Sequence, residues 1–424
     1  MYKKGELGND GKKVCWYGSK QLWIMIYTAI LFLIGSCVIG GNNNTVFPAF
    51  AEARGWNLDI INMISGIGCI MKAVGLLVLA STVRKLGEKK LIVITLFISA
   101  ALLVVFGTTT NQAIFLVVIL VLGFLGGGYE KNGGMSITAK WWPTKKGVVL
   151  GFTTMGIICM NFLYVPLMPK LFATTSLETG MIIIAIILAV VAVLGLLFVK
   201  NTPEEAGTYP DGDPDFAKHG AEIAKEMQEY KSPFTLKKVC ADRNTWLIGI
   251  GSAFAFLAVM TYIASAIPVM VGYGYDYTVA TMIFAVGGVM GLVGSVVLGI
   301  VDQAIGTRKT FIIYFIFIII GFIFAYLMPH GLVFCWLAGI VIFAAQGALC
   351  NLLPSYVTTK YGRWDYSAGY KVIGTIFEIG AGIGVMATGI FKNPGQMFIF
   401  DLIILAIGLV MMIVSNDKLI GRPD

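Results

Sequence analysis

The chain has 424 residues, of which 57% are hydrophobic and only 13% are charged. This composition excludes a soluble domain of this size and indicates a polytopic membrane protein. The formal net charge of +8 does not indicate nucleic-acid binding, because the basic residues stand in small groups between apolar runs. The seven cysteines show no paired spacing and only two histidines are present, so we expect no disulfide framework, metal site or cofactor.

Runs of about 20 or more apolar residues, each long enough to cross a bilayer, recur twelve times. The first run lacks a small-residue cleavage site, so we expect a retained helix and not a signal peptide. The sequence therefore predicts an all-α polytopic membrane protein with an N-terminal tail at 1–20 and a C-terminal tail at 417–424. The predicted spans are approximately 21–47, 58–82, 90–109, 113–138, 147–172, 179–199, 245–272, 277–301, 309–328, 331–357, 366–390 and 395–416.

One long polar segment, residues 200–244, divides these spans into two sets of six. It begins with prolines, glycines and acids that are typical of turns. Residues 216–230 then carry charges at helical spacing, and residues 232–246 form an amphipathic stretch. We predict two six-helix bundles, 21–199 and 245–416, joined by a cytoplasmic linker with amphipathic helices.

The basic residues predict the orientation of the chain. An even number of spans places both termini on one side, and most of the 31 lysines and arginines then fall on that side. Only Arg54, Lys170 and Lys392 fall on the other. Because basic loops stay in the cytoplasm, both termini are predicted to be cytoplasmic, in the cell membrane.

Five ionisable residues lie well inside the predicted spans: Lys72, Glu130, Lys131, Lys371 and Glu378. Charge in hydrocarbon is costly, so such residues indicate a functional site. Lys371 and Glu378 are about two helical turns apart and share one helix face, whereas the adjacent Glu130 and Lys131 point about 100° apart. The alternative for the lysine–glutamate pairs is a purely structural bridge, and Lys72 could also snorkel.

The two halves repeat. The turn after the second span, which contains Gly87, lines up with the turn after the eighth, which contains Asp302, Gly306 and Arg308. Val83 stands where an acid equivalent to Asp302 would fall. The fourth span lines up with the tenth at the same offset. Internal repeats of this kind are common in transporter folds.

The turn that runs from Gly299 through Asp302 and Gly306 to Lys309 resembles the loop motif of the major facilitator superfamily, and the resemblance spans the whole chain. Three further segments are similar to signatures of its oxalate:formate antiporter and monocarboxylate transporter branch: 47–56 (FPAFAEARGW), 141–151 (WWPTKKGVVLG) and 201–210 (NTPEEAGTYP). The resemblance implies two six-helix bundles that work by alternating access, with a gating motif at Gly87, Asp302, Gly306 and Arg308.

In this superfamily the second and eleventh helices face each other and the fourth lies beside the second, so the resemblance implies one network of all five charges at a central cavity. Three lysines against two glutamates leave one positive charge, which an incoming carboxylate would neutralise. Lys371 matches the lysine with which this branch binds a carboxylate. The eighth span has no basic residue to match the branch's arginine, so a dicarboxylate is not favoured.

Uncharged polar residues would complete the substrate site that the resemblance implies. Asn42 to Asn44 are consecutive and point in three directions, so at most two of them can contact a ligand. A coupled proton would be carried by Glu130 or Glu378. The further candidates for substrate contact are Asn43, Asn44, Tyr129, Tyr262, Gln346, Asn351 and Tyr370.

We therefore expect a secondary transporter of a small organic anion, a monocarboxylate, that acts as a proton symporter or anion exchanger. Its expected partners are the substrate, protons and the lipid bilayer, and it is expected to be a monomer. Two alternatives stay open. One is a transporter of zwitterions or amines, whose ammonium group would meet the glutamates, and the other is a non-transporting nutrient sensor on the same fold. The spans contain no nucleophile–base or metal constellation, so an enzyme is not expected.

Overall fold

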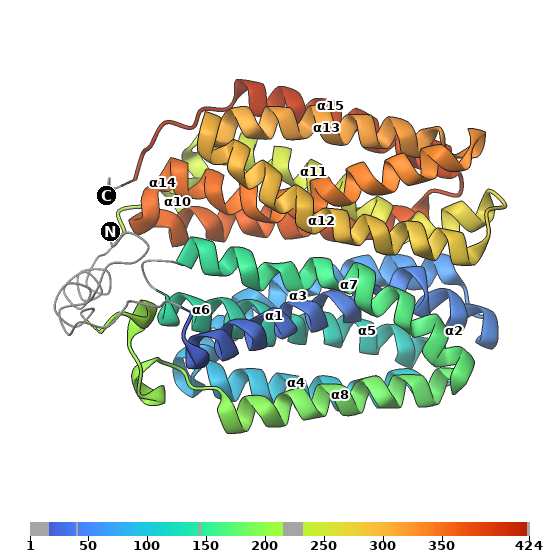
Figure 1. The fold of residues 1–424 in the computed structure, drawn as a ribbon, viewed down its shortest axis with the longest axis horizontal. Coiled ribbons are helices and arrows are strands. Elements are labelled where there is room, and N and C mark those ends of the chain that lie inside the picture. The colour runs from blue at the N-terminus through green and yellow to red at the C-terminus, as the bar shows by residue number, and fades with distance from the viewer. Residues whose placement is uncertain (1–16, 40, 143–145, 215–231, 422–424) are drawn as a thin grey trace.

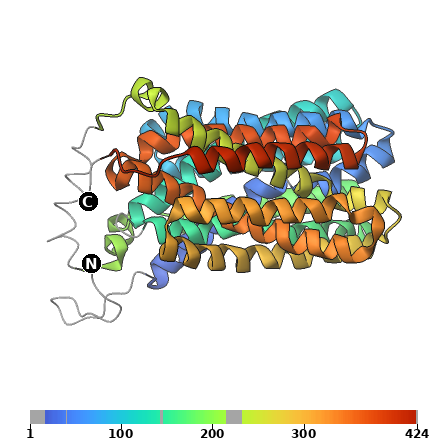
Figure 2. The same cartoon turned by 90° about the horizontal axis from the view of Figure 1, so that it is seen from above.

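The computed structural model describes residues 17–39, 41–142, 146–214 and 232–421. Two bundles of long helices lie side by side along one axis (Figure 1), and the view from above shows the same direction for the helices (Figure 2). The start of α1 and the end of α15 lie at the same end of the molecule, here called the terminal end, and the opposite end is called distal. Twelve helical segments are long and apolar enough to cross a membrane, which confirms the predicted all-α polytopic fold.

The first bundle, the N-half, begins with a helix that is shorter than the predicted span 21–47. The helix ends at Ile39 and a 3₁₀ turn follows, because the asparagine side chains there bond to backbone and compete with a continuing helix. The elements of the N-half are α1 Ser19–Ile39, η1 Gly41–Asn44, α2 Val46–Arg54, α3 Leu58–Leu86, α4 Glu88–Thr108, α5 Gln112–Gly126, the π-helix η2 Gly127–Gly134, α6 Met135–Trp141, α7 Lys146–Thr174 and α8 Leu177–Phe198.

The second bundle, the C-half, contains the remaining six spans. Its tenth and eleventh spans follow each other directly and together make up α14, with a kink at Gly362 between them. Gly362 has φ 69°, a left-handed value that glycine adopts without strain. The elements are α10 Leu236–Ala241, α11 Arg243–Gly272, α12 Tyr277–Ile305, α13 Thr307–Tyr326, η5 Met328–His330, α14 Leu332–Ile390 and α15 Pro394–Val414.

The linker starts with two short turns, η3 Glu204–Ala206 and η4 Pro210–Gly212, that lie against the N-half. The Lys20 ammonium donates to the Ala206 carbonyl at 2.5 Å, and the Gln21 amide donates to the Thr208 hydroxyl at 2.7 Å. The helix α10 falls within the predicted amphipathic stretch 232–246. The helix predicted for 216–230 lies outside the described residues.

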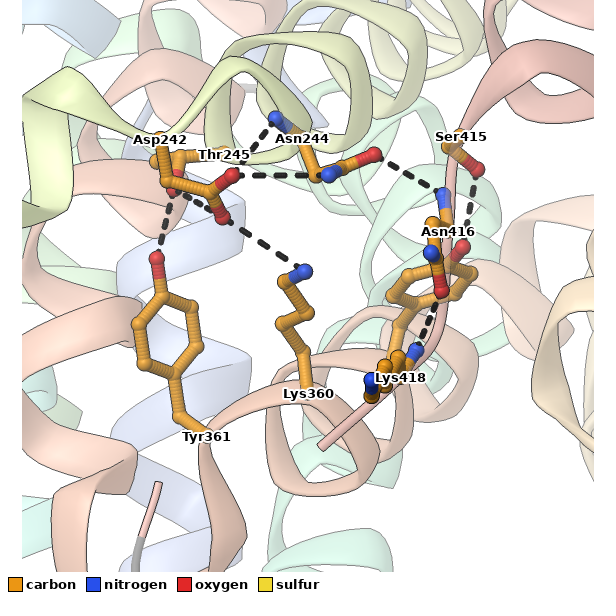
Figure 3. Close-up of polar contacts among 9 residues, drawn as sticks. Asp242, Asn244, Thr245, Lys360, Tyr361, Ser415, Asn416 and Lys418 are labelled. Atoms are coloured by element: carbon orange, nitrogen blue, oxygen red, sulfur yellow. Dashed lines mark hydrogen bonds and ion pairs between the residues drawn. The ribbon is translucent and has the colours of Figure 1, made fainter. Parts of the chain in front are cut away.

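Polar contacts fasten the last described residues to the C-half at the terminal end (Figure 3). Asp242 caps the first turn of α11, and the Lys360 ammonium lies 3.6 Å from its carboxylate. The Asn416 N–H donates to the Asn244 side chain at 2.9 Å, and the Ile420 N–H donates to the Lys360 carbonyl at 2.8 Å. The break between the tenth and eleventh spans is thereby held beside the start of α11.

Candidate functional site

The two halves meet most closely near the distal end, where α3 packs on α14 and α7 packs on α12. A Cβ atom added to Gly66 of α3 would lie 2.5 Å from the Gly382 carbonyl of α14, and one added to Gly382 would lie 2.7 Å from the Gly66 carbonyl. Gly288 of α12 similarly leaves room for Asn161 of α7. Small residues allow this close approach of helix backbones.

The same helix faces are uncovered toward the terminal end. Leu77 lies about three helical turns from Gly66, and Lys371 about three turns from Gly382, so both sit on the faces that touch distally. Leu77 is nevertheless 47% exposed, and Lys371 is exposed. A Cβ on Gly299 of α12 would meet open space. The interface between the halves is therefore closed at the distal end and open at the terminal end.

A cavity of about 60 Å³ lies between the halves, where the closed part of the interface ends. Residues of both halves line it, among them Lys72, Glu130, Lys131, Gln346 and Glu378. Its volume is enough for a few water molecules or a small anion. The predicted position of a site between the two bundles is matched by this cavity.

Four charged side chains form a continuous row of ion pairs at the cavity, here called the charge cluster: Lys72, Glu130, Lys131 and Glu378. Lys72 of α3 contacts Glu130, and the Lys131 ammonium lies 3.3 Å from Glu130 Oε1 and 2.7 Å from Glu378 Oε1. The Glu130 side chain is 1% exposed. Two lysines balance two glutamates, so the cluster is neutral, and the Lys131–Glu378 pair joins the two halves.

A π-helix, η2, carries Glu130 and Lys131. The two adjacent residues were expected to point about 100° apart, and they meet different partners: Glu130 contacts Lys72, and Lys131 contacts Glu378. The π-turn that carries them is a feature common at functional sites. The Asn132 side chain donates to the Gly127 carbonyl at 3.0 Å and to the Leu76 carbonyl of α3 at 2.9 Å, which ties η2 to α3. Gly35 of α1 provides space for Glu130, because a Cβ there would collide with its carboxylate.

The predicted network of five charges is wrong in one member, Lys371. It is exposed, does not line the cavity and forms no ion pair with a described residue. Because it lies about two turns from Glu378 on the same helix face, it stands on the terminal side of the cavity. The neighbouring Tyr370 stacks on Tyr366 with ring centroids 5.2 Å apart. The predicted excess positive charge is therefore absent from the charge cluster.

The uncharged candidates are distributed over several environments. Gln346 lines the cavity and accepts a hydrogen bond from Asn161 of the other half at 2.9 Å. Asn351 donates instead to the Ser295 hydroxyl at 2.5 Å, away from the cavity. Tyr262 is fully buried among aromatic rings of the C-half. Tyr129 is fully buried in the N-half and its hydroxyl has no hydrogen-bond partner among the described residues.

The asparagines of η1 point in three directions, as predicted, but toward three helices. The Tyr164 hydroxyl of α7 donates to Asn42 at 2.6 Å. Asn43 donates to Asn62 of α3 at 3.0 Å and accepts from the Ser65 hydroxyl at 3.1 Å. The prediction of Asn43 as a substrate contact is not matched by this geometry, because its side-chain amide is already bonded to α3 and does not line the cavity.

The third asparagine, Asn44, links the two halves. Its amide nitrogen donates to the Ile263 carbonyl of α11, and its oxygen accepts from the Ile267 N–H at 3.3 Å. In an uninterrupted α-helix these two backbone groups would bond to each other. Asn44 therefore bonds to both groups of one helix turn in the C-half, and it serves the interface and not the cavity in this structure.

The predicted gating motif lies in the turns at the terminal end. Gly87 and Gly306 have left-handed φ values of 80° and 88°. Asp302 accepts a hydrogen bond from the Ser355 hydroxyl at 2.6 Å, and Arg308 donates to the Ile413 carbonyl at 2.5 Å. No ion pair joins Asp302 to Arg308 in the described structure, and both side chains bond within the C-half.

The two repeated helix bundles meet at the distal end, separate at the terminal end and have a charged cavity between them. This is the architecture of a secondary transporter. The chain belongs to the Major Facilitator Superfamily, whose family model matches residues 28–385. It is therefore a multi-pass membrane transporter and not an enzyme.

Solved structures with the same fold include one described as a bacterial homolog of the human lysosomal transporter Spinster, in an inward-facing and occupied conformation. It shares 13% sequence identity with this chain, with a TM-score of 0.72 over 93% of this chain and 96% of that one. A second structure with the same description, inward-facing and unoccupied, shares 14% identity with a TM-score of 0.69 over the same fractions. At this identity the similarity shows the fold alone. No curated protein sequence matches the chain.

Proposed function

We propose that this transporter moves a small organic anion, a monocarboxylate, together with a proton. The observation that carries the proposal is the Lys131–Glu378 pair, 2.7 Å long, which connects the two halves inside the central cavity. A substrate carboxylate and the Glu378 carboxylate compete for the same ammonium group. Similarity of the segments 47–56, 141–151 and 201–210 to the oxalate:formate and monocarboxylate branch supports the same substrate class.

The neutrality of the charge cluster favours proton symport over anion exchange. An anion that entered alone would bring a third negative charge to two lysines, and an unpaired charge in a low-dielectric site is costly. Protonation of Glu378 removes one negative charge and releases Lys131 in the same step. One proton and one substrate carboxylate then restore neutrality, which a dicarboxylate would not do.

Lys371 belongs to the entry path in this proposal. It is exposed on the same helix face as Glu378, on the side where the halves separate. An exposed lysine there raises the local concentration of anions before they reach Lys131. The distribution of basic residues supports cytoplasmic termini, so the open end would face the cytoplasm.

Thermal unfolding of the purified protein tests the substrate class. We expect lactate, pyruvate and acetate to raise Tm at mildly acidic pH, because a ligand that binds only the folded state stabilises it by mass action. Alanine and ethanolamine should have no effect. Lys131→Gln should abolish the shift, Lys371→Gln should weaken it, and the exposed control Lys237→Gln should leave it unchanged. A shift with the amine or the amino acid, but not with the carboxylates, would contradict the proposal.

A further inference from the structure

A second recess, of about 560 Å³, lies in the N-half between the start of α1 and the end of α8. We call it the α1–α8 crevice and define it by Lys20, Trp23, Trp141, Phe198 and Lys200. None of these residues lines the central cavity. The substrate proposal therefore leaves this crevice without a role.

Two aromatic side chains of α1, Tyr27 and Trp23, reach α8 beside the crevice. The Tyr27 hydroxyl of α1 donates to the Val191 carbonyl of α8 at 3.2 Å, and Gly195 leaves space for the tyrosine ring. One turn closer to the terminal end, the large Trp23 and Phe198 rings meet edge to face at 6.1 Å.

The linker closes the crevice at the terminal end. The Lys20 ammonium donates to the Ala206 carbonyl at 2.5 Å, and the buried Trp141 indole donates to the Lys200 carbonyl at 3.2 Å. These contacts hold the first linker residues over the apolar walls. The result is a compartment with a polar roof and an apolar lower part.

The charges of the crevice favour an anionic ligand. Lys20 and Lys200 both line it. An ammonium has three N–H donors, so Lys20 keeps donor capacity beyond its carbonyl contacts. One acid, Glu205, also lines the crevice, and its carboxylate already accepts the Asn201 N–H at 3.1 Å.

The position of the crevice favours a lipid. It lies where the first span begins and the sixth ends, the level at which tryptophans and lysines meet lipid headgroups. Leu197 and Phe198 are more than half exposed on the outer surface of α8, beside the apolar part of the crevice. We propose that the α1–α8 crevice binds an anionic phospholipid, with its phosphate between Lys20 and Lys200 and an acyl chain along Leu197 and Phe198.

Native mass spectrometry of the purified transporter tests this proposal, with phosphatidylglycerol and phosphatidylcholine of equal chain length as probes. The wild type should retain more phosphatidylglycerol. The double variant Lys20→Gln/Lys200→Gln should lose this preference by about fivefold for each lysine, as expected for basic residues at an anionic membrane surface. The matched control Lys237→Gln/Lys238→Gln removes two exposed lysines from α10 and should keep the preference.

Three outcomes would overturn the proposal. The wild type could retain both lipids equally, the crevice variant could keep the wild-type preference, or both double variants could lose it to the same extent. A further measurement distinguishes a phospholipid from free phosphate as the ligand. Inorganic phosphate or glycerol phosphate at millimolar concentration should not displace the bound phosphatidylglycerol, because neither offers an acyl chain to Leu197 and Phe198. Displacement by either would contradict a lipid site.

Discussion

The turn after α3 and the turn after α12 hold equivalent places in the two halves, yet different chemistry stabilises them. In the N-half, Glu88 accepts from the Ser136 hydroxyl at 2.7 Å and from the Lys140 ammonium at 2.8 Å. In the C-half the equivalent residue is Thr307, whose hydroxyl lies 3.1 Å from that of Ser355. The backbone geometry is repeated, but the ion pair of Glu88 with Lys140 is replaced at Thr307 by a contact between two hydroxyl groups.

The central cavity shows the same asymmetry on a larger scale. Three members of the charge cluster come from the N-half, and only Glu378 comes from the C-half. At one constant offset along the sequence, the C-half counterparts of Lys72, Glu130 and Lys131 are Gly291, Leu349 and Cys350. The repeat thus supplies a symmetric scaffold, whereas the charges of the cluster are concentrated in the N-half. In the proposed mechanism, the substrate carboxylate competes with the single C-half carboxylate, Glu378, for Lys131.

The largest effect is expected from Glu130→Gln, because it leaves two buried lysines with one carboxylate. Breaking a buried ion pair from one side costs about 3–5 kcal/mol, so Tm in detergent should fall by several degrees. Glu178→Gln is the control, since Glu178 is 58% exposed and lies 3.7 Å from Arg54. An exposed pair of this kind contributes about 1 kcal/mol or less. Equal losses in both variants would contradict the assignment of Glu130 to a buried cluster of ion pairs.

A smaller effect is expected at the turns. Glu88→Gln removes charge-assisted hydrogen bonds, which contribute about 1.5–3 kcal/mol, whereas Thr307→Val removes neutral ones, which contribute about 0.5–1.5 kcal/mol. The loss in the N-half turn should also shrink at high salt, because the Lys140 side chain is 45% exposed and its ion pair is screened. Chemical denaturation of both variants at two salt concentrations measures the difference. Equal losses of stability in the two variants at low salt would contradict the claim that the N-half turn is the more strongly stabilised.

Asn44→Ala should have the smallest effect on stability and a clear effect on conformation. The Ile267 N–H can bond to the Ile263 carbonyl, so α11 loses little, but one of the distal links between the halves is lost. Spin labels at the exposed positions Ala53 and Asn393, near the distal ends of the two halves, should show an added population at longer distance by double electron–electron resonance. The control Asn351→Ala removes a side-chain hydrogen bond within the C-half and should leave the distances between the spin labels unchanged. An unchanged distribution of spin-label distances in Asn44→Ala would contradict a role for Asn44 in holding the two halves together.

The sequence was sufficient for the spans and for four of the five intramembrane charges, because apolar runs and isolated charges are local signals. Apolar length alone could not place the end of α1, where asparagine side chains bond to backbone and other helices. The π-turn of η2 was also missed, since the expected angle between Glu130 and Lys131 assumed the 3.6-residue period of an α-helix. The five glycines on either side of these charges, at 126–128, 133 and 134, were the available signal.

Tertiary contacts were beyond the reach of the sequence. Nothing in the pattern around Lys371 distinguishes a cavity-lining lysine from an exposed one, because its helix face is covered at Gly382 and open three turns away. The partner of Asn44 likewise lies in the other half and is a pair of backbone groups, which leave no trace in the side-chain pattern.

The number of protons that accompany each substrate molecule tests the central claim most directly. Proteoliposomes with an internal pH dye would be given the monocarboxylate that produces the largest rise in Tm, with the wild type and Glu378→Gln compared side by side. We predict one proton per carboxylate in the wild type. The variant, whose position 378 is always neutral, should exchange carboxylate but should no longer accumulate it along a proton gradient. Proton-driven accumulation by Glu378→Gln at the wild-type stoichiometry would contradict the account.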